Sequence, residues 1–324
     1  MSSSTVWTLV IAEEVYDLVL DDVFLQLHQL VPGSSVFLKI EGLNPAGSVK
    51  LKTAVALVEE AEASGFRFPR TRLIESTSGN LGVALAMVCA AKGYFLTCVT
   101  DPNANPQTVR LMEALGAEVV MVTARDGNGG FLQSRIDYIR QRLSREPDLH
   151  WVNQYANPAG PQAHRQRTGR SIFEALGRVD YVFVGAGTTG TLMGCAEFFR
   201  CHSPGTRIIA VDSVGSVTFG GPAARRHIPG LGTSRRPEIL SETLVDEVVL
   251  VSEAESVAVC RTLARERGLL LGGSTGTVLS AVQSAAKKIP DGSVVVAVSP
   301  DFGDRYLDTI YNDSWVAERW PEQV

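Results

Sequence analysis

The stretch Asn44-Pro45-Ala46-Gly47-Ser48-Val49-Lys50 joins two segments of different character. The run before it, Val36 to Ile40, is apolar and branched, which is typical of a β-strand. The run after it, Lys52 to Ala63, is rich in Ala and Glu, which favour a helix. Lys50 is therefore expected at a strand-to-helix junction, where α/β sheets bind ligands. A lysine there is suited to form an imine with a carbonyl cofactor, although a single such lysine is more often a solvated residue of a first helical turn.

Length and composition limit the class of protein. With 324 residues, 45% of them hydrophobic and 20% charged, the chain fits a soluble globular protein with room for two domains. The formal net charge is −5 and no basic block is present, so nucleic acid is not an expected partner. No apolar run reaches the roughly 20 residues that span a bilayer, and no basic residues precede the apolar patch at 6–12. We expect a cytoplasmic protein that binds small molecules and no membrane.

Cysteine and histidine spacing gives no sign of a metal site. The five histidines are scattered, and the five cysteines lack the spacing of metal ligands, so we expect free thiols and no bound metal. These cysteines are Cys89, Cys98, Cys195, Cys201 and Cys260.

Strand-like and helix-like runs alternate from residue 36 onward. Strands are expected at 72–75, 95–100, 118–122, 150–153, 180–184, 207–212, 245–251 and 293–299. Helices are expected at 81–91, 106–115, 131–144, 164–176, 191–199, 253–267 and 278–288. Repeated strand-loop-helix units predict parallel sheets with helices on both faces. Residues 15–30 have no clear period, and Asn157 to Pro161 breaks the pattern, which indicates a crossing between domains.

A second junction, Gly185-Ala186-Gly187-Thr188-Thr189-Gly190-Thr191, follows an expected strand and opens an expected helix. Its glycines and the free N–H groups of the helix start suit a phosphate. Asp212 ends the next strand, about 20 residues on, as an acid that binds ribose would in a dinucleotide site. A nicotinamide-dependent oxidoreductase is therefore one interpretation, and a tight structural turn is another.

Two further Gly/Ser/Thr-rich segments resemble binding loops. Ser76 to Asn80 precedes one expected helix, and Gly272 to Thr277 is expected as a loop before the helix at 278–288. Either segment alone is best explained as an ordinary helix N-cap. A dehydrogenase needs one such loop. Three of them with a junction lysine predict a ligand held at a phosphate, a ring and a carboxylate.

Four segments together resemble the pyridoxal-phosphate enzymes of fold type II, and most closely the cysteine synthase and cystathionine β-synthase branch. They occur in family order: Asn44 to Lys50, Thr77 to Asn80, Gly187 to Thr191 and Gly272 to Gly276. The resemblance implies two three-layer α/β/α domains with mostly parallel sheets, like the tryptophan synthase β-subunit, and a homodimer. It also implies a smaller, mobile N-terminal domain at 36–157 and a larger cofactor-binding domain formed by 1–35 and 158–324.

The resemblance assigns roles to residues. Lys50 would be the catalytic lysine that forms a Schiff base with pyridoxal 5'-phosphate, Asn80 would bond the cofactor's phenolic oxygen, and Ser274 would face its pyridine nitrogen. The cofactor's phosphate would lie against Gly187, Thr188, Thr189, Gly190 and Thr191. The substrates would be held by Thr77, Ser78, Gln154, Tyr155, Arg135 and Arg235.

The chain departs from the family pattern at four places. The family usually continues Lys-Asp-Arg, whereas this chain has Lys50-Leu51-Lys52. Cysteine synthases carry a threonine where this chain has Leu81, and the usual Gly-Asn-Thr-Pro near the N-terminus is replaced by Leu20-Asp21-Asp22-Val23. Thr189 stands where glycine is usual. These changes alter the substrate side more than the cofactor side, which puts cysteine synthesis itself in question.

Several segments resemble a narrower group, the synthases that begin 2,3-diaminopropionate formation in siderophore and peptide-antibiotic biosynthesis. They are Glu75 to Gly82, Gly129 to Phe131 with Arg135, Asn153 to Asn157, Pro229 to Gly232 with Ser234 and Arg235, and Asp304 to Asp308. This resemblance implies that O-phospho-L-serine loses phosphate and that L-glutamate adds, giving N-(1-amino-1-carboxyl-2-ethyl)-L-glutamate. The alternatives are a cysteine synthase (O-acetylserine or O-phosphoserine sulfhydrylase), an NAD-dependent oxidoreductase, and an inactive regulatory binding module.

Overall fold

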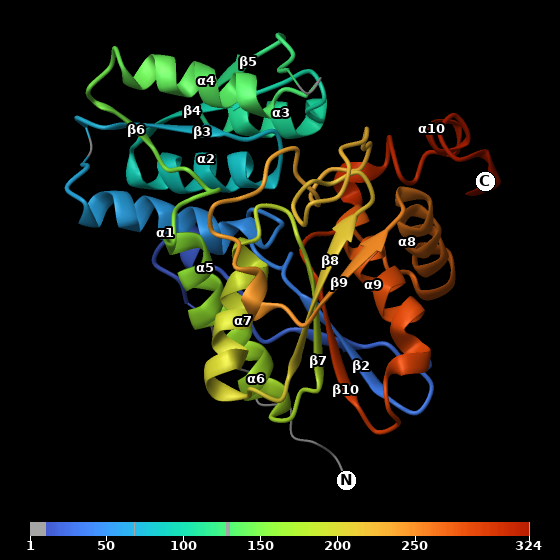
Figure 1. Cartoon of the computed structure of the whole chain (residues 1–324). Coiled ribbons are helices and arrows are strands. Elements are labelled where there is room, and N and C mark those ends of the chain that lie inside the picture. Colours follow the sequence, from blue (N-terminus) through green and yellow to red (C-terminus); the bar gives the residue numbers. More distant parts are fainter. Residues whose placement is uncertain (1–10, 68, 128–129, 324) are drawn as a thin grey trace.

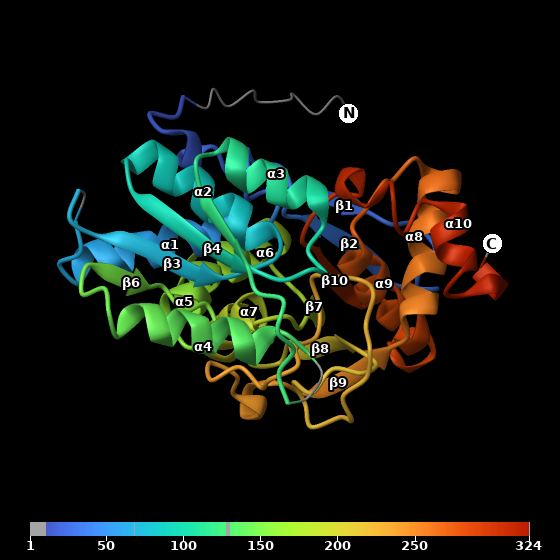
Figure 2. The same cartoon turned by 90° about the horizontal axis from the view of Figure 1, so that it is seen from above.

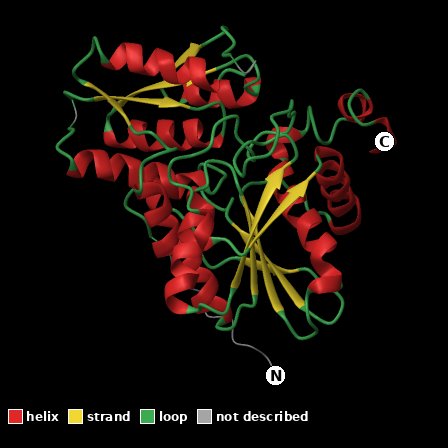
Figure 3. Ribbon diagram, viewed as in Figure 1, coloured by secondary structure: helices red, strands yellow, loops and turns green. Residues whose placement is uncertain are grey.

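The protein was analysed as a computed structural model that describes residues 11–67, 69–127 and 130–323. Two sheets, each flanked by helices, make up the fold (Figures 1 and 3). The larger sheet has the strand order β1-β2-β10-β7-β8-β9, and the smaller sheet has the order β5-β4-β3-β6. Strands β1 and β2 pair antiparallel, and every other paired neighbour is parallel. The expected α/β fold with mostly parallel sheets is confirmed.

The element bounds follow the expected alternation closely. The strands are β1 (Phe24–Gln26), β2 (Ser35–Ile40), β3 (Arg72–Ser76), β4 (Phe95–Thr100), β5 (Glu118–Met121), β6 (Leu149–Trp151), β7 (Tyr181–Gly185), β8 (Arg207–Ser213), β9 (Glu247–Val251) and β10 (Val294–Ser299). The helices are α1 (Lys50–Ala63), α2 (Asn80–Lys92), α3 (Pro106–Ala114), α4 (Leu132–Leu143), α5 (Ala159–His164), α6 (Arg170–Leu176), α7 (Gly190–His202), α8 (Glu253–Arg267), α9 (Gly273–Ala285) and α10 (Asp313–Ala317).

Helices cover both faces of each sheet. In Figure 1, α5, α6 and α7 lie on one side of the larger sheet, and α8 and α9 lie on the other. Helix α4 covers one face of the smaller sheet, while α1 and α2 lie against the other, and Figure 2 shows the two sheets side by side from above. Each layer is fixed by apolar burial, for example by Leu57 and Leu85 between α1 and α2 and by Val182 and Leu192 beneath α7.

Two expectations about local structure were wrong. The expected loop at Gly272 to Thr277 is mostly helix, because α9 begins at Gly273. A Cβ added at Gly276 would lie 2.3 Å from the carbonyl oxygen of Ser256, so this glycine allows α9 to pack closely on α8. The single helix expected at 164–176 is a π-helical turn, η2 (Arg165–Gly169), followed by α6. Residues 15–30, left unassigned, contain a short 3-10 helix, η1 (Val15–Asp17), and β1.

Strand β2 belongs to the larger sheet, although the expected smaller domain began at residue 36. It pairs with β10 from Ser35 to Ile40. We therefore propose one domain built on β3 to β6 and another built on the six-stranded sheet, with the chain entering the smaller domain after β2.

Of the segment at 129–131 that contributes to the narrower resemblance, Gly129 lies outside the described residues.

The structure bears on two further expectations. All five cysteines are free thiols. Among the described residues, no helix has both the length and the apolar character needed to cross a bilayer.

Gly194 on α7 gives a test of this packing. A Cβ added there would lie 2.4 Å from the carbonyl oxygen of Pro161 and 2.5 Å from Cβ of His164. We expect Gly194→Ala to lower the free energy of unfolding by about 1–3 kcal/mol, because α5 cannot yield without moving its backbone. Gly205 has no atom within 4 Å of an added Cβ, so Gly205→Ala should stay within about 0.5 kcal/mol of wild type. Equal denaturant midpoints for the two variants would contradict the close approach.

Candidate active site

A pocket of about 250 Å³ lies where the carboxyl ends of parallel strands from both sheets meet. Its wall includes Ser76 at the end of β3, Gly185 at the end of β7 and Pro300 just after β10. The loops that leave these strands supply the polar groups of the wall, as expected for an α/β fold. Thirteen of the fourteen site residues expected from the sequence line this pocket, and Arg235 does not.

Lys50 is the first residue of α1 and lines the pocket. The loop before it is fixed by Asn44, whose Nδ2 donates to the carbonyl oxygens of Glu41 and Ser48, both at 2.9 Å. Burial lowers the pKa of Lys50, and the nearby carboxylates of Asp301 and Glu41 only partly oppose this. A larger fraction of the amine is therefore uncharged, as a nucleophile or a base requires.

Asn80, at the start of α2, is held from two sides. Its Nδ2 donates to Oδ2 of Asp301 at 2.7 Å, and its Oδ1 accepts a hydrogen bond from Arg305. Tyr306 donates its hydroxyl hydrogen to the same Asp301 oxygen at 2.6 Å. The carboxylate of Asp301 and the guanidinium of Arg305 thus fix the orientation of the Asn80 amide, which holds Asn80 in one position at the pocket wall.

Asp301 is the one acidic side chain in the pocket wall within the part of the chain that the structure describes. It is buried, and burial raises its pKa. Its Oδ1 has no hydrogen-bond partner among the described residues. Asp301, Arg305 and Tyr306 were not singled out individually from the sequence, although Asp301 could have been found because it is the second residue after the last buried strand.

The segment from Gly187 to Thr191 forms a cradle at the N-terminus of α7. A Cβ added at Gly187 would lie 2.8 Å from the carbonyl oxygen of Gly230, so only glycine allows this approach. Thr189 has a φ of +68°, a conformation that branched residues rarely adopt. Its Oγ1 is buried and has no hydrogen-bond partner among the described residues. Free N–H groups, the helix dipole and an unused hydroxyl favour an anion here.

On the opposite side, Arg135 of α4 reaches the pocket from the smaller sheet. Its guanidinium is buried, donates to the Ser78 hydroxyl and lies 3.4 Å from Oδ2 of Asp101. The Arg135 Nε has no hydrogen-bond partner in the described part of the chain. Arg235 instead forms an ion pair with Glu238 outside the pocket wall.

The remaining expected residues also line the pocket. Thr77 accepts a hydrogen bond from the Gly82 N–H at 3.1 Å, which leaves its hydroxyl hydrogen available to a ligand. Gln154 donates to the carbonyl oxygen of Ser76 at 3.0 Å, and Tyr155 follows it in the wall. Ser274 is buried in the first turn of α9. The segment Pro229 to Gly232, noted in the sequence only as part of a resemblance, forms further wall beside it together with Thr233.

The nicotinamide-dependent alternative finds little support in this geometry. Asp212, the proposed acid of a dinucleotide site, is buried outside the pocket wall and accepts from the Ser213 N–H at 2.8 Å. Among the described residues, no group of three or more His, Cys, Asp or Glu side chains could hold a metal ion.

Comparisons with known proteins show the family to which the chain belongs. Residues 24–301 match the family described as "Pyridoxal-phosphate dependent enzyme". The structure resembles O-ureido-L-serine synthase, with a TM-score of 0.85 and 31% identity over 95% of this chain and 100% of that one. It also resembles a hydrogen sulfide-producing enzyme from Fusobacterium nucleatum (TM-score 0.86, 29% identity, 92% and 99% covered). A third similar structure is the O-acetylserine dependent cystathionine beta-synthase from Helicobacter pylori (TM-score 0.85, 29% identity, 94% and 100% covered).

The residues present fit pyridoxal phosphate. The cradle at Gly187 to Thr191 offers neutral donors and one unused hydroxyl to its phosphate, and Lys50 offers an amine with a lowered pKa in the same pocket. Asn80 and Ser274 supply polar groups between these two points of attachment.

Thr189 gives a test with effects of opposite sign. Thr189→Gly should raise the free energy of unfolding of the cofactor-free protein by about 0.5–1 kcal/mol, because glycine removes most of the strain at positive φ. The same change should weaken binding of pyridoxal phosphate by roughly tenfold, because a hydrogen bond to a charged phosphate is lost. Denaturant unfolding and a visible-absorbance titration measure the two effects. Thr189→Ser keeps the hydroxyl and should keep the affinity; a loss as large as that of glycine would contradict the assignment.

Proposed function

The chain belongs to the pyridoxal-phosphate dependent enzymes, and from this premise we propose that it joins O-phospho-L-serine and L-glutamate to N-(1-amino-1-carboxyl-2-ethyl)-L-glutamate and releases phosphate. Its cofactor is pyridoxal 5'-phosphate, and its class is that of the cysteine synthase-like β-replacement enzymes. We further propose a homodimer and a place in 2,3-diaminopropionate biosynthesis, both from the resemblance described above.

The buried guanidinium of Arg135 carries the proposal for acidic substrates. The cradle at Gly187 to Thr191 provides neutral donors for the cofactor's phosphate, so that phosphate needs no arginine. Arg135 faces the same pocket with an unpartnered Nε among the described residues. A buried guanidinium binds carboxylate or phosphate strongly, and the two proposed substrates bring one phosphate and three carboxylates.

The chain's own residues account for the proton movements of such a replacement. When bound, pyridoxal phosphate supplies an electron sink for negative charge at the substrate Cα. The Nζ of Lys50, whose pKa is lowered by burial, takes the Cα proton of phosphoserine. The Cβ–O bond then breaks, and phosphate leaves with the electron pair. The glutamate amine forms the Cβ–N bond and gives its proton to the released phosphate, after which Lys50 returns its own proton to Cα.

Sulfide is the competing nucleophile. One similar structure is a hydrogen sulfide-producing enzyme and another is named for cystathionine synthesis, so sulfur chemistry is represented among the relatives. Against a cysteine synthase, Leu81 places an apolar side chain in the pocket wall where the resemblance expects a threonine hydroxyl. A nicotinamide-dependent reaction is not supported, because the chain matches the pyridoxal-phosphate family and Asp212 lies outside the pocket wall.

One experiment tests the substrates directly. The holoenzyme is incubated with O-phospho-L-serine and, in separate reactions, L-glutamate, other amino acids, and sulfide, and the products are identified by mass. We expect the glutamate adduct, with phosphate released in equal amount. A marked preference for sulfide would replace the proposal with a cysteine synthase, and no product from phosphoserine with any nucleophile would remove the proposed first substrate.

Arg135 gives the matched mutational test. Arg135→Ala should lower kcat/KM for adduct formation by roughly ten- to a hundredfold, because a charge-assisted contact contributes about 1.5–3 kcal/mol. The visible absorbance of the bound cofactor should be retained, since Arg135 contacts Ser78 and Asp101 and not the cradle. Arg235→Ala serves as the comparison, since Arg235 lies outside the pocket wall and should change kcat/KM less than threefold. Equal losses in both variants would argue against a specific contact of Arg135 with substrate.

A further inference from the structure

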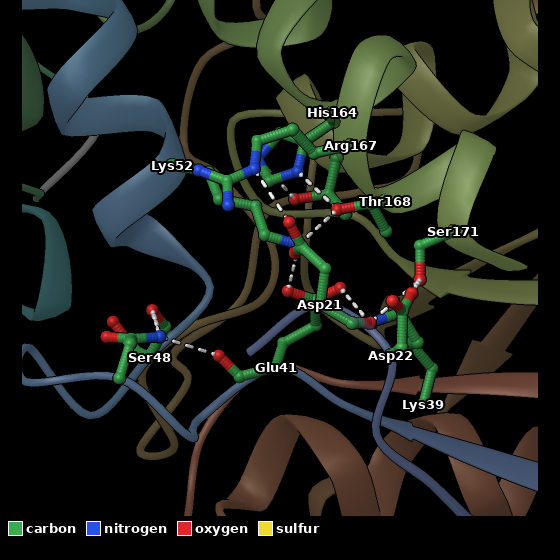
Figure 4. Close-up of polar contacts among 12 residues, drawn as sticks. Asp21, Asp22, Lys39, Glu41, Ser48, Lys52, His164, Arg167, Thr168 and Ser171 are labelled. Carbon is green, nitrogen blue, oxygen red and sulfur yellow. Dashed lines mark hydrogen bonds and ion pairs between the residues drawn. The ribbon is translucent and has the colours of Figure 1, made fainter. Parts of the chain in front are cut away.

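A cluster of buried charges lies behind the cofactor pocket. Figure 4 shows Lys39, Glu41 and Lys52 together with Asp21 from the N-terminal segment. Both lysines and Glu41 are buried, and none of these four residues lines the pocket. The two lysines are matched by the two carboxylates, and Arg167 at the edge of the cluster also pairs with Asp21. Lys39 and Lys52 each lie within ion-pair distance of Glu41, at 3.1 and 2.6 Å.

Asp21 is one of the residues that attach the N-terminal segment to the rest of the protein. Its carboxylate forms an ion pair with Lys52 of α1 and accepts from Nε of Arg167 at 2.7 Å. Its backbone carbonyl oxygen accepts from the Ser171 hydroxyl of α6 at 2.7 Å and from Lys39 of β2. One residue thus connects strand β2, the two helices α1 and α6 and the π-helical turn η2.

Lys52 extends this contact toward the pocket. Its Nζ donates to Oγ1 of Thr168 at 3.0 Å, and Nδ1 of His164 lies 3.1 Å from the same oxygen. The opposite ring nitrogen of His164, Nε2, lies 3.3 Å from Oγ1 of Thr191 in the cradle. The same nitrogen lies 3.0 Å from Oγ1 of Thr53, one turn after Lys50. The polar contacts are therefore continuous from Asp21 to the cradle.

The charge states of His164 and Glu41 are consistent with polar contacts that hold the cradle in place. Burial lowers the pKa of His164 well below its ordinary value, and the charges of Lys52 and Lys50 lower it further. The ring is therefore neutral, so one nitrogen donates and the other accepts. Burial alone would raise the pKa of Glu41, but the adjacent Lys52 and Lys39 lower it below its ordinary value, which keeps the carboxylate charged.

We propose that Asp21 and Lys52 form a coupled pair that positions the phosphate cradle through Thr168, His164 and Thr191. Asp21 and Lys52 stand at two of the four departures from the family pattern noted in the sequence, at 20–23 and 50–52, and the structure brings them into contact. The pair does not touch the pocket, so its effect on the cofactor passes through side chains with defined hydrogen bonds. Loss of either charge leaves its partner's charge unbalanced, and we expect the hydrogen bonds of Thr168, His164 and Thr191 to rearrange in response.

The test is a double-mutant cycle on cofactor binding by the full-length protein. Asp21→Asn and Lys52→Met should each weaken the affinity of the cofactor-free protein for pyridoxal phosphate by about tenfold, measured by visible-absorbance titration. The double variant should lose no more than the weaker-binding single variant. The ³¹P resonance of the bound cofactor should move in both single variants, because the phosphate environment changes. Thr168→Val interrupts the path without removing a charge and should give a several-fold loss with the same kind of ³¹P shift.

Two controls separate positioning from general stability. Asp22 is exposed and its carboxylate accepts from the Ser171 hydroxyl, so Asp22→Asn should bind within twofold of wild type. Asp246 binds Arg200 at 2.5 Å and the Ile208 N–H at 2.6 Å near the amino end of β8, so Asp246→Asn should lower stability and leave cofactor affinity unchanged.

Three results would overturn the proposal. One is wild-type affinity and an unshifted ³¹P resonance in Asp21→Asn, whatever its melting temperature. Another is losses that simply add in the double variant. If Asp21→Asn does not fold, Thr168→Val decides, and wild-type cofactor binding by that variant would show that the path carries no effect. None of these readouts depends on which nucleophile the enzyme uses.

Discussion

Parallel pairing is the constraint on which the rest of the structure depends. Because paired strands other than β1 and β2 are parallel, each sheet presents the carboxyl ends of its strands at one edge. The two edges meet at the pocket. The helices that follow the strands begin there, and the N–H groups of a first helical turn have no hydrogen-bond partner within the helix. The first turns of α2, α7 and α9, at Asn80, Gly190 and Ser274, therefore place helix N–H donors at the same pocket. A ligand with several anionic groups satisfies these donors.

The sequence predicted what is local. Each of the junctions at Lys50, Asn80 and Thr191 is readable because a strand pattern, a Gly/Ser/Thr segment and a helix pattern follow one another within a short span. The contacts between junctions were not readable. Asn80 meets Asp301 across 221 positions, and no local pattern reports that pairing. The placement of β2 was mistaken for a related reason, because a strand's neighbours in a sheet are set by pairing rather than by order in the chain.

Glycine was the least reliable guide to loops in the sequence, because it occurs both in binding loops and at close contacts between helices. At Gly187 it allows the backbone to approach Gly230, as expected for a binding loop. At Gly276 it lies inside a helix and allows α9 to contact α8, where helix propensity alone would predict a loop. Conversely, Thr189 occupies a conformation that favours glycine. Strain of about 1–2 kcal/mol at a single residue is tolerated where surrounding packing holds it, and the buried hydroxyl gained there is a donor that glycine could not supply.

The distribution of charge explains why the pocket can hold anions without excess positive charge. In the wall, Lys50 has a lowered pKa and Arg135 lies near Asp101, so neither acts as a free surface cation. Behind the wall, Lys39 and Lys52 are balanced by Glu41 and Asp21. Neutral groups, His164 and the hydroxyls of Thr168 and Thr191, separate the two sets. A full charge next to the cradle would bind phosphate tightly but would also shift the pKa of Lys50. By keeping its buried lysines one layer back, the protein fixes the cradle through hydrogen bonds and leaves the amine of Lys50 available to accept a proton.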